Sequence, residues 1–234
     1  PPYNIDYDGG VNAKRNKILN DNLTDSEFGE FLKKAFAAAS FVMKKGAAFY
    51  IWHADKEVVN FRLACDFANL EVKQTLIWNK NAFTLGRQDY QWKHEPCLYG
   101  WKRGGSHYFT DERSYSTVID QEHLDIDKMK AADAKELLKK ILTETPTSII
   151  DADKPLKSEE HPTMKPIKLI GHQMINSTRK NQNVLDPFGG SGTTLIVAEQ
   201  LERNCYMCEL DPRYVDVIIE RWERLTGFTA NKIA

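Results

Sequence analysis

Residues 183–194 read NVLDPFGGSGTT, and this stretch decides the fold of the chain. A short apolar segment ends at Asp186, and three glycines follow before a segment with helical character begins. Glycine adopts positive φ easily and carries no Cβ, so the backbone can turn sharply and come close to a ligand. A strand, a glycine-rich turn and a helix in this order predict a ligand-binding edge of an α/β sheet.

The residues that are absent from this stretch exclude two classes of ligand for the turn. A phosphate-binding P-loop needs a lysine after the last glycine, where this chain has Thr193, and a dinucleotide fingerprint needs a third glycine at Leu195. An adenosyl group without phosphates remains, because carboxylates at the end of the next strand can accept ribose hydroxyl protons. A connector without a ligand is the structural alternative. The candidate cofactor-binding residues are Asp186, Phe188, Gly189, Gly190, Ser191, Gly192, Thr193, Glu209 and Asp211.

The rest of the chain alternates between helical and strand patterns. Residues 24–46 predict a helix that Thr24 caps and Gly46 ends, and Pro212 and Gly227 bound a final helix in the same way. Further helices are expected over 56–69, 165–177 and 192–201, and strands over 47–52, 72–78, 95–101, 183–186 and 204–210. This alternation predicts an α/β fold with a mostly parallel sheet and helices on both faces.

Residues 103–160 interrupt the alternation. They contain an amphipathic helix expected over 127–144 and a short strand expected over 147–153. Although the net charge of the chain is only −1, residues 111–160 hold 13 acidic against 8 basic side chains, whereas 161–182 hold four basic side chains and no acid. Charge is therefore segregated along the chain, and we interpret 103–160 as an insertion.

Composition excludes several classes of protein. No apolar run approaches the roughly 18 residues of a membrane helix, and nothing resembles a secretion leader, so we expect an intracellular protein without membrane contact. Four cysteines are too few and too scattered for a disulfide framework. Cys205 and Cys208 form a CxxC, but a zinc ribbon would need a second pair, so we expect no metal.

Four motifs in order resemble one family: PPY at 1–3, HPTMKP at 161–166, LDPFGGSGTT at 185–194 and ELDPRY at 209–214. Together they are similar to the S-adenosylmethionine-dependent DNA amino-methyltransferases of the permuted class, in which the catalytic half precedes the cofactor half. The resemblance implies a circularly permuted, Rossmann-like methyltransferase domain over 1–234, with a catalytic half (1–102), an inserted target-recognition region (103–160) and a cofactor-binding half (161–234).

The catalytic signature of that family is Asp-Pro-Pro-Tyr, of which this chain supplies Pro1, Pro2 and Tyr3. We therefore expect that an N-terminal segment with about two strands and the catalytic aspartate is missing from the chain as given. An exocyclic base amine is a poor nucleophile until acceptors take its N–H hydrogens, and two prolines would aim the Pro1 carbonyl for that purpose. Tyr3 would stack on the base, which must be flipped out of the duplex.

The resemblance implies methyl transfer from S-adenosylmethionine to N6 of adenine in a specific DNA sequence. Cytosine N4 is the near alternative, and a non-catalytic binding module and a nicotinamide enzyme are further ones. Thr163 and Lys165 would lie beside the charged tail of the cofactor. The expected partner is double-stranded DNA. We expect a cytoplasmic protein that is encoded by a bacterium or a phage. Whether it forms a homodimer, and whether it has a restriction endonuclease partner, stays open. The candidate DNA-binding residues are Lys80, Arg87, Lys93 and His94.

Overall fold

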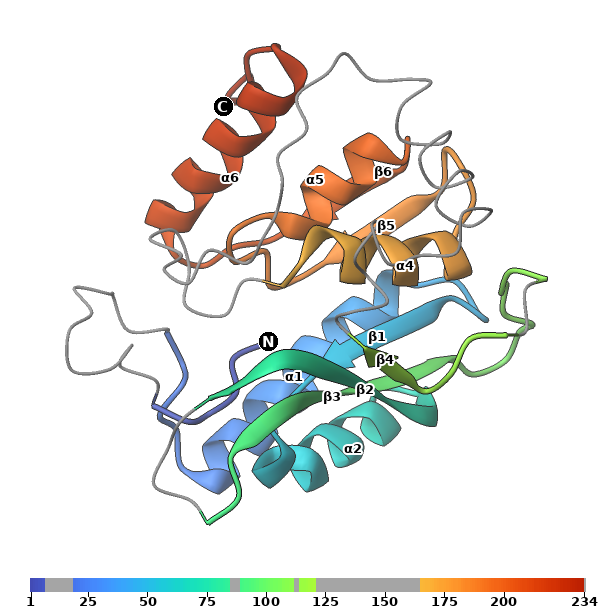
Figure 1. Cartoon of the computed structure of the whole chain (residues 1–234), viewed down its shortest axis with the longest axis vertical. Helices are drawn as coiled ribbons and strands as arrows, with labels where there is room; N and C mark the ends of the chain where they lie inside the picture. Colours follow the sequence, from blue (N-terminus) through green and yellow to red (C-terminus); the bar gives the residue numbers. More distant parts are fainter. Residues whose placement is uncertain (7–18, 85–88, 112–113, 121–164, 234) are drawn as a thin grey trace. The chain divides into compact units, whose positions relative to one another are not determined.

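The computed structural model describes residues 1–6, 19–84, 89–111, 114–120 and 165–233. These residues divide into two compact units (Figure 1). Of the described residues, unit 1 contains 1–6 and those within 20–120, and unit 2 contains Leu19 and 165–233. In the described part of the chain, no helix is both long and apolar enough to cross a membrane.

Unit 1 is built on a four-stranded sheet with the order β1–β3–β2–β4. The strands are β1 (Ala48–Trp52), β2 (Leu70–Thr84), β3 (Trp92–Lys102) and β4 (Val118–Asp120). β3 runs antiparallel to both β1 and β2, and β4 runs parallel to β2. The sheet of unit 1 is therefore mixed, and the expectation of parallel neighbours is wrong for β3, which is antiparallel to both β1 and β2. The connection between β2 and β3 is too short for a parallel crossover, so these two strands pair as a hairpin.

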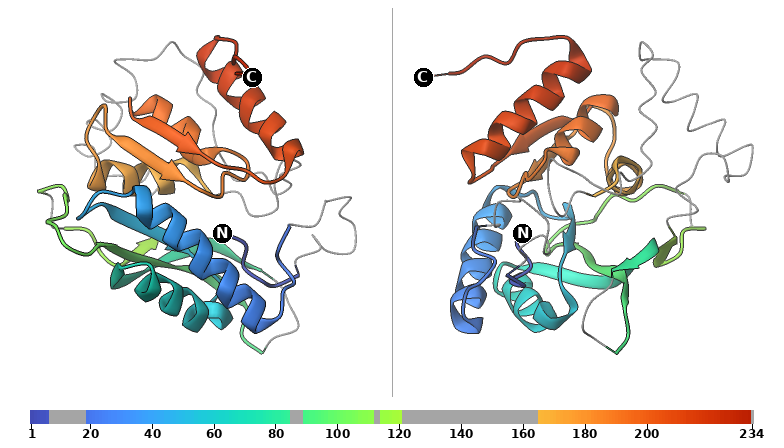
Figure 2. Two further views of the ribbon diagram at one scale, coloured as in Figure 1. Left: turned by 180° about the vertical axis from the view of Figure 1, so that it is seen from behind. Right: turned by 60° about the vertical axis from the view of Figure 1, so that its left-hand side comes forward.

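Two helices of unit 1 lie side by side (Figure 2). They are α1 (Asp25–Val42) and α2 (Val58–Phe67), and the 3-10 turn η1 (Asp55–Glu57) leads into α2. The capping box of Thr24 and Glu27 forms as predicted. The predicted end at Gly46 is wrong, because α1 already ends at Val42. Gly46 instead lies before β1 with φ +79°, where a Cβ would lie 2.0 Å from the Ser106 carbonyl oxygen.

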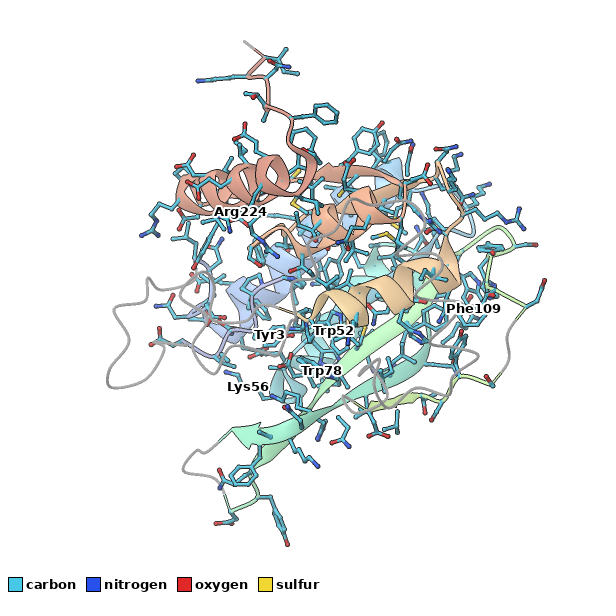
Figure 3. The ribbon with its side chains drawn as sticks, turned by 45° about the horizontal axis from the view of Figure 1, so that its top comes forward. Tyr3, Trp52, Lys56, Trp78, Phe109 and Arg224 are labelled. Carbon is cyan, nitrogen blue, oxygen red and sulfur yellow. The ribbon has the colours of Figure 1, made fainter. Side chains whose placement is uncertain are left out.

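Aromatic side chains fill the core of unit 1. Phe61 on α2 packs against Phe28 and Phe36 on α1, with ring centroids 5.8 and 6.1 Å apart. Trp52 at the end of β1 meets Trp78 on β2 edge to face, with centroids 6.1 Å apart (Figure 3). Since each large buried side chain stabilises the fold by about 1.5–3 kcal/mol, these contacts hold α1 against α2 and the end of β1 against β2, the strand that carries Lys80.

Unit 2 has two parallel strands, β5 (Asn183–Asp186) and β6 (Asn204–Met207). Its helices are α4 (Ile167–Ser177), α5 (Thr193–Gln200) and α6 (Pro212–Thr226). Met174, Val197 and Ala198 from α4 and α5 form a core that also receives Val184 and Cys205 from the strands. The α6 boundaries are confirmed, with Pro212 first and Gly227 at φ +72° after the end. The helix expected over 127–144 and the strand expected over 147–153 lie outside the described residues.

Replacing Thr24 with alanine removes one half of the capping box. We expect the Thr24→Ala variant to lose about 1 kcal/mol of unfolding free energy, because a helix N–H of α1 loses its acceptor. The control is Ser26→Ala, which changes an exposed hydroxyl in the same turn. Urea denaturation of both variants measures the difference, and equal stability of the two would contradict the role given to Thr24.

Candidate functional site

The glycine-rich turn of unit 2 is fastened at its start by Asp186. The Asp186 carboxylate accepts hydrogen bonds from the Phe188 peptide N–H at 3.0 Å and from Thr194 Oγ1 at 2.6 Å. Burial raises the pKa of Asp186, and these two hydrogen bonds act in the opposite direction. The side chain therefore ties the end of β5 to the first turn of α5.

The glycines of the turn are required by conformation and by packing. Gly190 and Gly192 have φ values of +53° and +81°, which other residues rarely adopt. A Cβ on Gly189 would lie 2.6 Å from Met207 Sδ. Ser191 and Thr193 are buried, and the Ser191 carbonyl accepts a hydrogen bond from Arg221 of α6. The turn thus lies tightly against β6 and α6.

Glu209 follows β6 and holds the turn from the other strand. Glu209 Oε2 accepts from the Gly190 peptide N–H at 2.6 Å, and Oε1 accepts from the Asp211 peptide N–H at 2.9 Å. Each carboxylate oxygen keeps further acceptor capacity after one hydrogen bond. An anionic acceptor beside a glycine-rich turn at adjacent strand ends fits an adenosyl group with free ribose hydroxyls.

Asp211 and Lys165 have other surroundings than Glu209, which contacts the glycine-rich turn. The Asp211 carboxylate caps α6 by accepting from the Arg213 peptide N–H at 3.0 Å, and it also pairs with the Arg213 guanidinium. The hydrogen bond from Arg213 lowers the pKa of Asp211. The Asp211 carboxylate is thus the N-cap of α6. Lys165 is half-buried just before α4, and Thr163 lies outside the described residues.

In unit 1 the Pro-Pro-Tyr motif is held through Tyr3. Its peptide N–H donates to Asp21 Oδ1 at 2.9 Å, and its phenol hydroxyl donates to Glu95 Oε2 at 3.0 Å. Pro1 and Pro2 are both half-buried. The structure therefore places the motif beside β3, although the two segments are about 90 residues apart in sequence.

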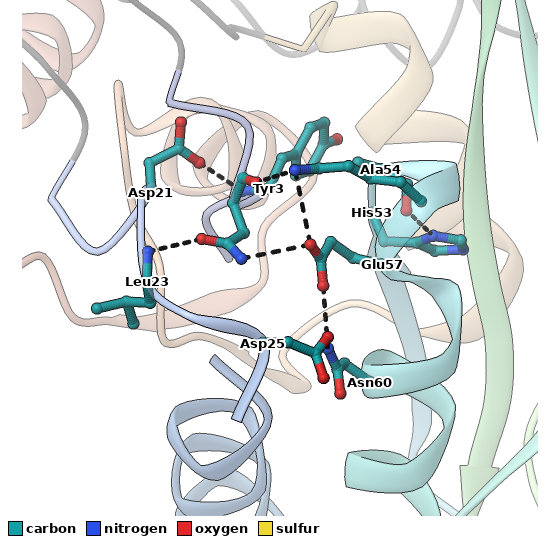
Figure 4. A network of polar contacts seen from close by, with 10 residues as sticks. Tyr3, Asp21, Leu23, Asp25, His53, Ala54, Glu57 and Asn60 are labelled. Carbon is teal, nitrogen blue, oxygen red and sulfur yellow. Dashed lines mark hydrogen bonds and ion pairs between the residues drawn. The ribbon is translucent and has the colours of Figure 1, made fainter. Parts of the chain in front are cut away.

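Asn4 continues this anchoring and has φ +54°, a conformation that asparagine tolerates better than most residues. Its side chain accepts from the Leu23 peptide N–H at 2.8 Å and donates to Glu57 Oε1 at 3.3 Å (Figure 4). Lys56 Nζ donates to the Asn4 carbonyl. Asn4 and Glu57 are only 8% and 7% exposed, so the backbone after Tyr3 is fixed by buried polar contacts.

Sequence reasoning missed these supporting residues. Asn4 adjoins the motif, which is a signal that could have found it. Glu57 stands in a polar run and carries no local signal, yet it also accepts a hydrogen bond from Asn60 Nδ2 at 3.0 Å. Asn60 in turn donates to Asp25 at 2.8 Å, which links the network to the start of α1.

The candidate DNA contacts on the β2–β3 hairpin separate into two groups. Lys80 is only 9% exposed, and its Nζ lies 3.4 Å from Glu95 Oε1. The sequence predicted an exposed lysine that contacts DNA, whereas the structure shows a buried one with an acidic partner. Lys93 is exposed, and the half-buried His94 lies edge to face with Trp92 at 5.4 Å. Arg87 lies outside the described residues.

The same hairpin carries exposed aromatic side chains that sequence reasoning overlooked. They are Phe83, Tyr90 and Trp92, and Tyr90 is 92% exposed. The signal is the stretch YQWKH at 90–94, in which aromatic and basic residues are interleaved. Such interleaving is typical of surfaces that bind nucleic acids.

The chain is similar to known DNA methyltransferases. The family model described as DNA methylase (N6_N4_Mtase) matches residues 1–220. The type II methyltransferase M2.MboI of Moraxella bovis is 36% identical over 73 residues, which are 31% of this chain and 27% of that protein. The DNA adenine methyltransferase YhdJ of Escherichia coli K12 is 24% identical over 242 residues, covering 100% of this chain and 78% of that protein.

Two solved structures share the fold. The complex of M1.HpyAVI with SAM has a TM-score of 0.59 at 21% identity, covering 81% of this chain and 82% of that one. The cytosine-N4-specific PvuII DNA methyltransferase has a TM-score of 0.62 at 16% identity, covering 96% and 79%. These likenesses confirm the Rossmann-like α/β fold expected from the sequence.

The buried amide of Asn4 gives a local test of the network in Figure 4. We expect Asn4→Ala to lower the unfolding free energy by about 1–3 kcal/mol, because the Leu23 N–H and the Glu57 carboxylate each lose a partner. Hydrogen exchange at the Leu23 amide should become faster in this variant. The exposed neighbour Asn22 supplies the control variant Asn22→Ala. Unchanged exchange at Leu23 would show that Asn4 does not hold this segment.

Proposed function

The chain belongs to the DNA methylase family, and from this premise we propose that it transfers a methyl group to N6 of an adenine flipped out of double-stranded DNA. S-Adenosylmethionine is the cofactor of the family. The observation that carries the proposal is the anchored Tyr3 of the Pro-Pro-Tyr motif, because its backbone is held at the peptide N–H and its ring at the hydroxyl. The similarity of the whole chain to an adenine methyltransferase supports the choice of base.

The cofactor-binding role falls to the glycine-rich turn of unit 2. Glu209 would accept the ribose hydroxyl protons, while Gly189, Gly190 and Gly192 allow the backbone to approach the adenosyl group. When bound, S-adenosylmethionine supplies an electrophilic methyl group on a sulfonium. Its positive charge also favours carboxylates near the site. Asp186 contributes by holding the turn, since its carboxylate already accepts from Phe188 and Thr194.

The catalytic role falls to the start of unit 1. The target amine needs acceptors for its N–H hydrogens before its lone pair can attack, and the Pro1 carbonyl is one such acceptor. In the family signature the aspartate carboxylate is the other. Tyr3 would stack on the flipped base and so offset part of the unstacking cost of a few kcal/mol. Because Asp21 and Asn4 hold this segment in the DNA-free protein, the acceptor and the ring are organised in advance.

DNA contacts are proposed for Lys93, His94 and Arg87 on the β2–β3 hairpin. Arginine and lysine dominate contacts to phosphates and to guanine edges. The exposed aromatic residues of the hairpin offer apolar surface beside these cations. Recognition of a specific sequence by residues 103–160, dimer formation and a restriction endonuclease partner stay predictions.

Cytosine N4 is the second candidate for the target. It is favoured by the likeness in fold to the cytosine-N4-specific PvuII enzyme. The chemistry offers no objection, because acceptors that polarise one exocyclic amine also polarise the other.

The modified base can be identified directly. The full-length protein is incubated with S-adenosylmethionine and unmethylated DNA, and the nucleosides are then analysed by mass spectrometry. We expect N6-methyladenine. If N4-methylcytosine is found instead, the target is cytosine and the second candidate is correct. If the protein is folded and binds the cofactor but neither methylated base forms, the proposed methyl transfer is contradicted.

Glu209 gives a separate test of the cofactor site. We expect Glu209→Ala to raise the dissociation constant of S-adenosylmethionine by about tenfold to a hundredfold, because hydrogen bonds to a charged acceptor are lost. The matched control is Glu220→Ala, which removes an exposed carboxylate from α6. Isothermal titration calorimetry measures both. Equal affinity of the Glu209 variant and the control would rule out the proposed role in binding.

A further inference from the structure

A short polar chain connects the catalytic motif to the β2–β3 hairpin. The Tyr3 hydroxyl donates to Glu95 Oε2 at 3.0 Å, and Lys80 Nζ lies 3.4 Å from the other oxygen, Oε1. Tyr3 and Glu95 are 92 residues apart in sequence. Glu95 is paired with Trp78 in the antiparallel register, so Lys80 and Glu95 are neighbours on adjacent strands. The hairpin therefore brings a carboxylate to the phenol of the motif.

The Lys80–Glu95 pair lies at low exposure, with side chains 10% and 22% exposed. Removing two charges from water costs desolvation energy that their attraction repays only in part, so a buried ion pair is a weak source of stability. A carboxylate that is held by an ammonium on one oxygen and presents the other to a phenol does, however, give a directional acceptor, and the O···O distance here is 3.0 Å. The pair is thus better suited to orient Tyr3 than to stabilise the hairpin.

The two anchors of Tyr3 act at opposite ends of the residue. Asp21 fixes the peptide N–H, and Glu95 fixes the hydroxyl at the far end of the ring. With the backbone and the hydroxyl both held, χ1 has little freedom, so the position of the ring is set before any base arrives. The hydroxyl oxygen lies on the axis of χ2, so this contact places the ring rather than fixing its plane. Stacking on a ring that is already ordered costs less conformational entropy than stacking on a mobile one.

Building on the proposed function, we propose that Glu95 is a positioning residue that holds the Tyr3 ring in place for stacking on the flipped base, and that Lys80 holds Glu95 in place. Glu95 acts through Tyr3 and takes no part in methyl transfer itself. This assignment gives Lys80 a role inside unit 1 in place of a phosphate contact.

The test is a double-mutant cycle in the full-length protein, read by single-turnover methyl transfer. Tyr3→Phe keeps the ring and removes the hydroxyl, and Glu95→Gln keeps the shape and removes the charge. We expect each variant to lower the rate by up to about tenfold, and the double variant to be no slower than Tyr3→Phe alone. Tyr3→Phe removes the donor of this hydrogen bond, and Glu95→Gln replaces its charged acceptor with a weaker neutral one. Glu71→Gln is the matched control, since it breaks the partly exposed Lys73–Glu71 pair on the same hairpin and should keep the wild-type rate.

A second readout reports on the base itself. Duplex DNA with 2-aminopurine at the target position becomes fluorescent when the base leaves the stack, and an aromatic ring stacked on it quenches this fluorescence. We expect brighter complexes with Tyr3→Phe and Glu95→Gln than with the wild type, at unchanged affinity for S-adenosylmethionine and with melting temperatures close to that of the control variant.

The outcomes separate this inference from the proposed function. If the wild-type protein methylates DNA but the two substitutions act additively, keep the wild-type rate or leave the fluorescence unchanged, Glu95 does not position Tyr3. A fall in melting temperature that accounts for the lost rate would equally overturn the positioning role. If the wild-type protein transfers no methyl group, the proposed function fails first, whatever the cycle shows.

Discussion

The buried carboxylate of Glu57 is the interaction on which the arrangement of unit 1 depends. It accepts hydrogen bonds from Asn4 and Asn60 and lies 3.6 Å from the ammonium of Lys56. A buried charge is costly unless it is paired and hydrogen-bonded, so these partners must stay in place. Because they come from the segment after Tyr3 and from the η1–α2 connection, one carboxylate fixes the motif to the fold.

Both candidate sites use backbone conformations that most residues avoid. Asn4 has a positive φ directly after the Pro-Pro-Tyr motif, and Gly190 and Gly192 have positive φ in the turn of unit 2. In each case a carboxylate on another element holds the segment, Glu57 in unit 1 and Glu209 in unit 2. Glycine adopts positive φ without strain, whereas the positive φ of Asn4 persists because its surroundings hold it. A carboxylate from a distant element therefore fixes the backbone both at the catalytic motif and at the cofactor turn.

Features with short-range causes could be predicted from the sequence. The Thr24 cap, the Pro212 start of α6, and the strand, turn and helix around Gly190 follow from residues within a few positions of each other. The end of α1 was predicted at Gly46 because glycine often follows a helix, but Gly46 serves a close approach to Ser106 instead. Strand direction in the β2–β3 hairpin was missed, since apolar patterning locates strands without orienting them.

Long-range partners explain the remaining differences. Nothing local shows that Tyr3 meets Glu95, or that Asn4 meets Glu57 at a separation of 53 residues. Lys80 was expected to contact DNA because its charge was visible and its partner, 15 residues away, was not. The capping role of Asp211 could have been predicted, because an aspartate directly before a proline that starts a helix is a typical cap.

The central claim is that the catalytic motif is organised before DNA binds, through the contacts of Tyr3 and Asn4. A crystal structure of the full-length protein with duplex DNA and a non-reactive analogue of S-adenosylmethionine tests this most directly. The account predicts a base stacked on Tyr3, the Tyr3 hydroxyl still bonded to Glu95, and a Tyr3–Asn4 backbone displaced by less than about 1 Å from the DNA-free protein. A displacement above about 2 Å, or a flipped base that does not contact Tyr3, would contradict it.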